Sequence, residues 1–235
     1  MTTRCPGLDL VKWVALLTML GDHLRYAWPD LAGLVLPGRL AFPLFCLAIA
    51  WHAARATPAT FRTGRHGRYL AWMLVFSAAS EPAYRWLDSG SMTLNVMPTL
   101  TLGLLVAYGV QVDDRLARLG GAVALSTALL ASPWLMYGWA GVLLPAGWLL
   151  ALRTGRWSIV VLMMLAVAGN LTDDWLRAHA GEPWGLAILA AAACSAPLGL
   201  WLLRQDSVTP WRVGRWAYGF YPVHLVIIRL LQGMG

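Results

Sequence analysis

The chain has 235 residues, of which 59% are hydrophobic and 12% charged, with a mean hydropathy of +0.60. So few charged residues cannot cover the surface of a soluble domain. This composition instead predicts a single membrane-embedded helical domain that spans residues 1–235. The net charge of +7 does not indicate a nucleic-acid partner, because the arginines lie in short loops between apolar runs.

Nine apolar runs predict an all-α fold, a polytopic membrane bundle of about nine transmembrane helices. In chain order the runs are 8–28, 35–53, 69–87, 94–112, 119–135, 138–152, 157–171, 184–203 and 216–233. Some of these runs are short, and one or two of them are also compatible with half-spanning segments.

The basic residues predict the orientation of this bundle. If the N-terminus is cytoplasmic, most of the 18 lysines and arginines fall in cytoplasmic loops, as the positive-inside rule requires. The acids favour the opposite side. The outer loops hold Asp30, Asp88, Asp173, Asp174 and Glu182. We therefore predict a cytoplasmic N-terminus, a C-terminus on the far side and contact with membrane lipids.

The first run carries an acid and a histidine, Asp22 and His23, inside an apolar helix. His23 lies about 16 Å along the helix from Lys12 and on nearly the same face. Ionisable residues at such depth are costly and indicate a functional site. We interpret His23 as a general base and Asp22 as an acid that orients it. The alternative is a buried pair that only ties helices together. No cluster has metal-ligand spacing, so no metal is expected.

The next runs place further polar residues at the same level. Arg39, in "GRLAFPLF", lies at the outer mouth of the second run, and we expect Pro43 inside that helix, where it would free a backbone carbonyl. We expect it to pair with Asp22, to hold an anionic substrate group or simply to reach the interface. Glu81 lies near the outer end of the third run and Asn95 at the start of the fourth. Because Pro82 follows Glu81, the pair also fits a helix end with Glu81 in a loop.

Two more features complete the set. The segment 52–68, "HAARATPATFRTGRHGR", has the highest basic density in the chain. It is typical of a loop that contacts anionic lipid, and it also suits docking of a phosphate-rich donor such as coenzyme A. His224 lies about 13 Å into the last run, counted from Arg215. Because Pro222 removes a backbone donor, we expect a bent helix in which His224 either lines a cavity or is structural.

The order of these motifs resembles the TraX family of conjugative pilin acetylases, and most of all TrbP-type conjugal transfer proteins. The motifs are LD-x-x-K-x-x-A…DH, GRLAFP-x-F, SEP-x-Y, LN…TL-x-x-G and FYP-x-HL, within residues 8–103 and 215–228. The resemblance implies a multi-pass enzyme of the bacterial inner membrane. Such an enzyme moves an acetyl group from cytoplasmic acetyl-CoA to the N-terminal amine of a membrane-inserted pilin subunit, in pilus biogenesis and conjugal plasmid transfer.

With this resemblance, the candidate residues take roles in acyl transfer. The expected ligands of the acetyl-CoA phosphates are Lys12, Arg62, Arg65 and Arg68. The expected catalytic group is Asp22, His23, Glu81 and His224. The expected contacts of the reacting oxyanion are Arg39, Tyr84 and Asn95. In this scheme His23 takes a proton from the amine, and Asp22 or Glu81 sets the tautomer of its ring.

Two other functions fit the same composition. A non-enzymatic inner-membrane factor for pilin maturation or assembly explains the hydrophobicity equally well, but it leaves Asp22, His23 and His224 as structural residues. A small transporter would use Asp22 and His23 as a proton relay. Against the transporter, no pair of broken helices occurs in matching halves of the chain.

Overall fold

The computed structural model describes residues 4–62, 64–154 and 156–233, and these residues form helices without any strand. The helices are α1 (Pro6–Leu24), α2 (Val35–Gly38), α3 (Ala41–Ala53), α4 (Pro58–Arg62), α5 (Arg65–Leu87), α6 (Val96–Gln111), α7 (Arg115–Leu130), α8 (Gly138–Thr154), α9 (Arg156–Asn170), α10 (Asp174–Ala178), α11 (Pro183–Leu203) and α12 (Trp216–Gln232), with 3-10 segments η1 (Pro29–Leu34) and η2 (Ser132–Trp134). The prediction of an all-α fold is confirmed, and each predicted run coincides with a helix or, for the second run, with α2 and α3.

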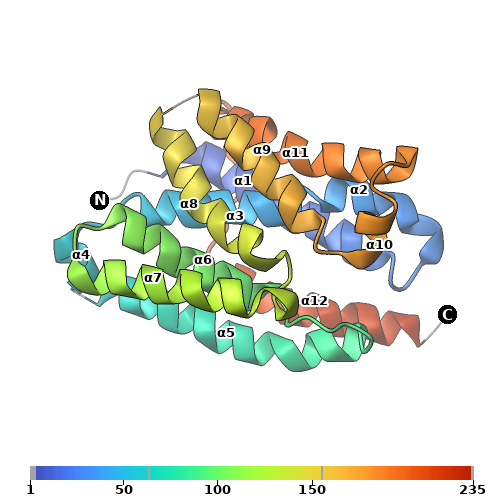
Figure 1. The fold of residues 1–235 in the computed structure, drawn as a ribbon. Helices are drawn as coiled ribbons and strands as arrows, with labels where there is room; N and C mark the ends of the chain where they lie inside the picture. The colour runs from blue at the N-terminus through green and yellow to red at the C-terminus, as the bar shows by residue number, and fades with distance from the viewer. Residues whose placement is uncertain (1–3, 63, 155, 234–235) are drawn as a thin grey trace.

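Helix α3 lies at the centre of the bundle, buried along almost its whole length. Helices α1, α6, α8 and α11 pack around it. The indole nitrogen of Trp148 in α8 donates to the carbonyl of Pro43 at 2.9 Å. The long helices run lengthwise, so the bundle has two ends (Figure 1). Helix α1 begins at the end that carries α4, called the α4 end, and finishes at the end that carries α10, called the α10 end.

The first and last helices are in contact, although they are far apart in the sequence. Near the α4 end, the indole nitrogen of Trp13 donates to the carbonyl of Trp211 at 2.8 Å. The amide of Val213 donates to Asp9 at 3.3 Å. These bonds tie the start of α1 to the segment before α12, which brings the end of α1 beside the middle of α12.

Two prolines lie differently from the prediction. Pro43, expected inside the second helix, is in the first turn of α3, because α2 ends at Gly38 and a new helix begins at Ala41. The first turn tolerates proline since its amide has no helical partner. Pro82 lies inside α5, which continues to Leu87. Glu81 is therefore part of a helix, and the loop alternative for it is wrong.

Large apolar side chains face outward from the bundle. On α7, for example, Leu116 is 69%, Val123 65% and Leu130 80% exposed. Within the described residues, two segments are long and apolar enough to cross a membrane, Pro29–Ala53 and Pro183–Leu203. The helices Val96–Gln111 and Ser158–Asn170 are apolar but shorter. These features suggest a membrane protein, and the count of about nine spans stays a prediction.

Candidate active site

Three cavities lie along α1. At the α4 end, the basic cavity of about 400 Å³ is lined by Arg4, Lys12, His52, Arg55, His66 and Arg212. The apolar cavity of about 130 Å³ is lined by Leu16, Ala48, Ile49, Met73, Leu100 and other apolar residues. At the α10 end, the polar cavity of about 380 Å³ is lined by Asp22, His23, Arg39, Tyr84, Tyr137 and Asn170 among others.

Neighbouring cavities share wall residues, so they form a series. Lys12 and His52 line both the basic and the apolar cavity. The apolar and polar cavities share Met19, Phe45, Val96 and Tyr221. The series therefore follows α1 from Lys12 to His23, a distance of about 16 Å at the rise of an α-helix.

The basic cavity has an excess of positive charge. Arg4 pairs with Asp9 at 3.0 Å, so these two charges offset each other. Among the described residues, Lys12, Arg55 and Arg212 form no ion pair with a carboxylate. The ammonium of Lys12 instead donates to the carbonyl of Val213 at 3.4 Å. Unpaired cations around one cavity are suited to a polyanion such as a phosphate group.

The expected phosphate ligands fall in different places. Lys12 lines the basic cavity as expected. Arg68 is exposed and is not among the residues that line the cavity. The side chains of Arg62 and Arg65 lie outside the described part of the chain. The structure also adds Arg55, which belongs to the basic segment 52–68 but was not named individually, and Arg212, which lies outside that segment.

The polar cavity begins where α1 meets α2. A Cβ atom added at Gly38 would lie 2.5 Å from the Cβ of Asp22, so only glycine permits this approach of the two helices. The carboxylate of Asp22 pairs with Arg25 at 3.0 Å, one turn further along the chain. Of the three alternatives for Arg39, the ion pair with Asp22 is therefore wrong.

Arg39 reaches the polar cavity without a carboxylate partner among the described residues. One of its terminal nitrogens donates to the side-chain oxygen of Asn170 at 3.2 Å. Its Nε is buried and has no hydrogen-bond partner. Asn170, which is itself buried, is held by a bond from its amide to the carbonyl of Ala166 at 2.8 Å. A guanidinium that is held in place and has an N–H group without a partner is suited to donate a hydrogen bond to an anionic oxygen.

His23 lines the polar cavity, and His224 lies behind it. The two rings meet at 2.7 Å between His23 Nδ1 and His224 Nε2. Their centroids are 4.9 Å apart and their planes 19° from parallel, so the rings meet edge to edge through these nitrogens. His224 is 3% exposed and is not among the residues that line the cavity. Of the expected catalytic residues, these two are therefore brought into direct contact.

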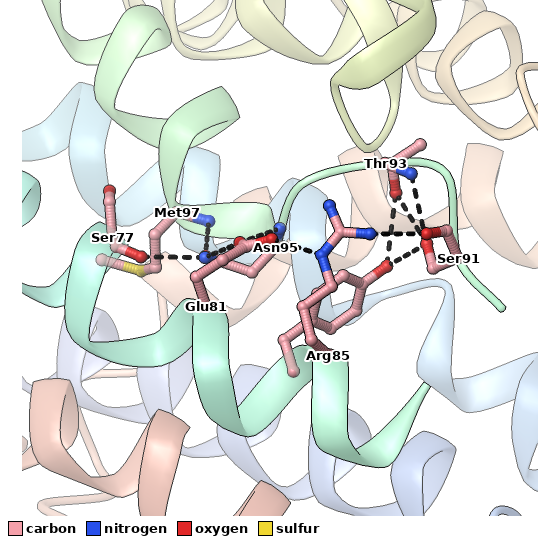
Figure 2. Close-up of polar contacts among 8 residues, drawn as sticks. Ser77, Glu81, Arg85, Ser91, Thr93, Asn95 and Met97 are labelled. Carbon is pink, nitrogen blue, oxygen red and sulfur yellow. Dashed lines mark hydrogen bonds and ion pairs between the residues drawn. The ribbon is translucent and has the colours of Figure 1, made fainter. Parts of the chain in front are cut away.

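Glu81 and Asn95 bond to each other between α5 and the start of α6 (Figure 2). One oxygen of Glu81 accepts from the backbone amide of Asn95 at 3.0 Å and from its side-chain nitrogen at 2.7 Å. The other oxygen accepts from Arg85 at 2.7 Å. Neither Glu81 nor Asn95 is among the residues that line the polar cavity. Their contacts fix the connection between the two helices.

Tyr84, on α5, bonds to the loop between α5 and α6 and also lines the polar cavity. Its hydroxyl group bonds to Ser91 at 2.6 Å and to Thr93 at 3.2 Å. Arg85 donates to the backbone carbonyl of Ser91 at 2.6 Å (Figure 2). Tyr84, Ser91 and Thr93 all line the polar cavity. Of the expected oxyanion contacts, Arg39 and Tyr84 lie at this cavity and Asn95 does not.

A family model described as TraX protein matches residues 7–232. The chain belongs to the TraX family. The predicted resemblance is confirmed, and it extends over nearly the whole chain. Membership connects the chain with conjugative pilin processing. No curated protein and no solved structure matches the chain.

The TraX chain thus has His23 and Arg39 at one end of a series of cavities and, at the other end, cations that form no ion pair with a carboxylate among the described residues. The sequence missed His52, Asn170 and Tyr221, whose positions depend on packing between distant helices. The apolar cavity between the two ends has a volume of about 130 Å³, and Lys12 is the charged residue in its wall. Such an arrangement can hold a charged head at one end and a reactive group at the other.

Proposed function

We propose that this TraX-family protein is a membrane-embedded acetyltransferase. It transfers an acetyl group from acetyl-CoA to the N-terminal amine of a pilin subunit, in pilus biogenesis and conjugal plasmid transfer. The observation that carries the proposal is the series of cavities along α1, which extends from the cations near Lys12 to His23.

The three cavities match the parts of the donor. The basic cavity takes the phosphate-bearing head, because Lys12, Arg55 and Arg212 are cations without carboxylate partners among the described residues. The apolar cavity takes the uncharged pantetheine arm, which in extended form is comparable in length to the distance from Lys12 to His23. The thioester then lies in the polar cavity, where the acceptor amine meets it.

The reaction uses His23 as the general base. The amine nitrogen attacks the thioester carbonyl, and its proton moves to His23. The charge that develops on the carbonyl oxygen is stabilised by Arg39 and by the hydroxyl group of Tyr84. The carbon–sulfur bond then breaks, and the protonated His23 returns its proton to the leaving thiolate. The products are an N-acetylated amine and coenzyme A, and no co-reactant is needed.

The membrane setting follows from the same features. Exposed apolar side chains such as Leu130 are suited to lipid rather than water. The cations at the α4 end support an orientation with that end in the cytoplasm, where acetyl-CoA occurs. In this orientation the chain crosses the bacterial inner membrane with about nine spans, and the polar cavity opens toward a membrane-inserted acceptor.

Intact mass spectrometry of the pilin tests this proposal. Pilin from cells that contain the protein is expected to be heavier by one acetyl group than pilin from cells that lack it. The His23→Ala variant is expected to lose this modification, since a general base contributes about 10²–10⁴-fold to a rate. An unmodified pilin in the presence of well-expressed wild-type protein would favour a non-enzymatic assembly factor.

A further inference from the structure

The contact between His23 and His224 determines which ring nitrogens carry hydrogen. His224 Nδ1 lies 2.9 Å from the backbone carbonyl oxygen of Phe220. A carbonyl oxygen can only accept, so Nδ1 of a neutral His224 carries a hydrogen and donates it. His224 Nε2 then has only a lone pair. His23 Nδ1, at 2.7 Å from that lone pair, must therefore be the donor in the second bond.

We propose that His224 is a positioning residue, which holds His23 in the Nδ1–H tautomer and leaves Nε2 of His23 unprotonated. In this tautomer the free lone pair belongs to the ring that lines the polar cavity, and the hydrogen points to the ring behind it. The use of that lone pair as a base rests on the proposed function, whereas the tautomer itself does not.

The surroundings of His224 keep its ring in place. The ring stacks on Phe220 with the centroids 5.0 Å apart and an angle of 12° between the planes. Tyr221 lies 5.6 Å from the same ring. Because His224 is 3% exposed, water cannot easily replace His23 as the partner of its Nε2. A rotation of either ring would leave a buried nitrogen without a partner.

His224 takes the role that we expected of a carboxylate. Asp22 is paired with Arg25, and Glu81 is bonded to Asn95 and Arg85. A neutral imidazole orients the base without adding a negative charge to the protein interior. When His23 accepts a proton at Nε2, its Nδ1–H keeps the bond to His224, and this bond becomes a stronger, charge-assisted one.

Nitrogen NMR of the full-length protein in detergent micelles tests the tautomer directly. With ¹⁵N-labelled histidine, two-bond ¹H–¹⁵N correlations distinguish protonated from unprotonated ring nitrogens. The signals of His23 are assigned by their loss in His23→Gln. We expect a protonated Nδ1 and an unprotonated Nε2 for His23 in the wild type. The opposite pattern would overturn the proposal, whatever the activity of the protein.

Two variants of His224 separate positioning from packing. His224→Gln keeps an acceptor near the position of Nε2, so we expect the Nδ1–H tautomer of His23 and acetyl transfer within about tenfold of wild type. His224→Leu removes the acceptor, so we expect His23 to change tautomer and transfer to fall by about 10²–10⁴-fold. The positioning role would be contradicted if His23 kept the Nδ1–H tautomer in His224→Leu. It would also be contradicted if His23 lost that tautomer in a His224→Gln protein with a wild-type melting temperature.

The chain provides a matched control. His179 Nδ1 also lies near the carbonyl four residues before it, at 2.8 Å from that of Trp175, but directly after the short helix α10 and, among the described residues, without a second histidine bonded to its ring. His179→Gln is expected to leave the His23 signals and acetyl transfer unchanged. If the tautomer is as expected while the wild type acetylates nothing, the proposed function fails and the tautomer assignment stands.

Discussion

Filling the apolar cavity should stop transfer without preventing the donor head from binding. Ala48 on α3 is buried and lines this cavity, whose volume is about 130 Å³. Ala48→Leu adds three carbon atoms to the wall of this cavity. The new side chain therefore obstructs the space that the donor arm is proposed to occupy. A donor arm displaced by even 1 Å is expected to lose about 10²-fold in rate.

The assay has two parts. Acetyl transfer to pilin by purified protein in lipid vesicles is expected to fall by about 10²-fold or more in Ala48→Leu. Calorimetric binding of adenosine 3′,5′-bisphosphate, which represents only the donor head, is expected to be unchanged, because the basic cavity is untouched. Ala71→Leu makes the same change on an exposed face of α5 and should affect neither part. Normal transfer by a stable Ala48→Leu protein would refute the passage along α1.

Three further predictions follow from named contacts. Arg55→Ala and Arg212→Ala each remove a solvent-exposed cation from the basic cavity. In steady-state kinetics, each variant should raise KM for acetyl-CoA roughly fivefold, equivalent to about 1 kcal/mol, with kcat little changed. Arg68→Ala, which is outside the cavity lining, should have no effect. Gly38→Ala places a Cβ 2.5 Å from that of Asp22 and should destabilise the fold by about 1–3 kcal/mol, measured by thermal unfolding. Gly33→Ala should be tolerated, because nothing lies within 4 Å of the added Cβ. Equal melting temperatures for the two variants would contradict the close approach of α1 and α2. Glu81→Ala leaves the donors of Asn95 and Arg85 without their acceptor, so it should lower the free energy of unfolding by about 1–3 kcal/mol. Acetyl transfer per folded molecule should stay near wild type. A large loss of rate without destabilisation would instead indicate that Glu81 is catalytic.

The sequence predicted the helices well because apolar runs of this length leave few alternatives. Each run coincides with a helix in the structure, and the family resemblance is confirmed. Local proline rules were less reliable. Pro43 and Pro82 both differ from expectation, because tertiary contacts decide whether a helix breaks at such a residue. At Pro82 the bonds between Glu81 and Asn95 accompany a helix that continues.

The site was predictable as a set of residues but not as a set of contacts. His23 and His224 stood out because ionisable residues are rare in apolar helices. Their direct bond joins the first and last helices, and helical periodicity says nothing about which helices are neighbours. Pairing of Asp22 with Arg39, one of three alternatives, was wrong for two reasons. Arg25, the partner of Asp22, lies one turn away and was predictable from the i,i+3 spacing, whereas Asn170, the partner of Arg39, is on a distant helix.

The central claim is that His23 is the general base for acetyl transfer from a donor whose phosphate-bearing head is held at the opposite end of the bundle. The most direct measurement is the intact mass of pilin after incubation with acetyl-CoA carrying a ¹³C-labelled acetyl group and the protein in lipid vesicles. The proposed function predicts that the N-terminal residue gains one labelled acetyl group with wild-type protein and none with His23→Ala. A pilin without label in both reactions, or with equal label in both, would contradict it.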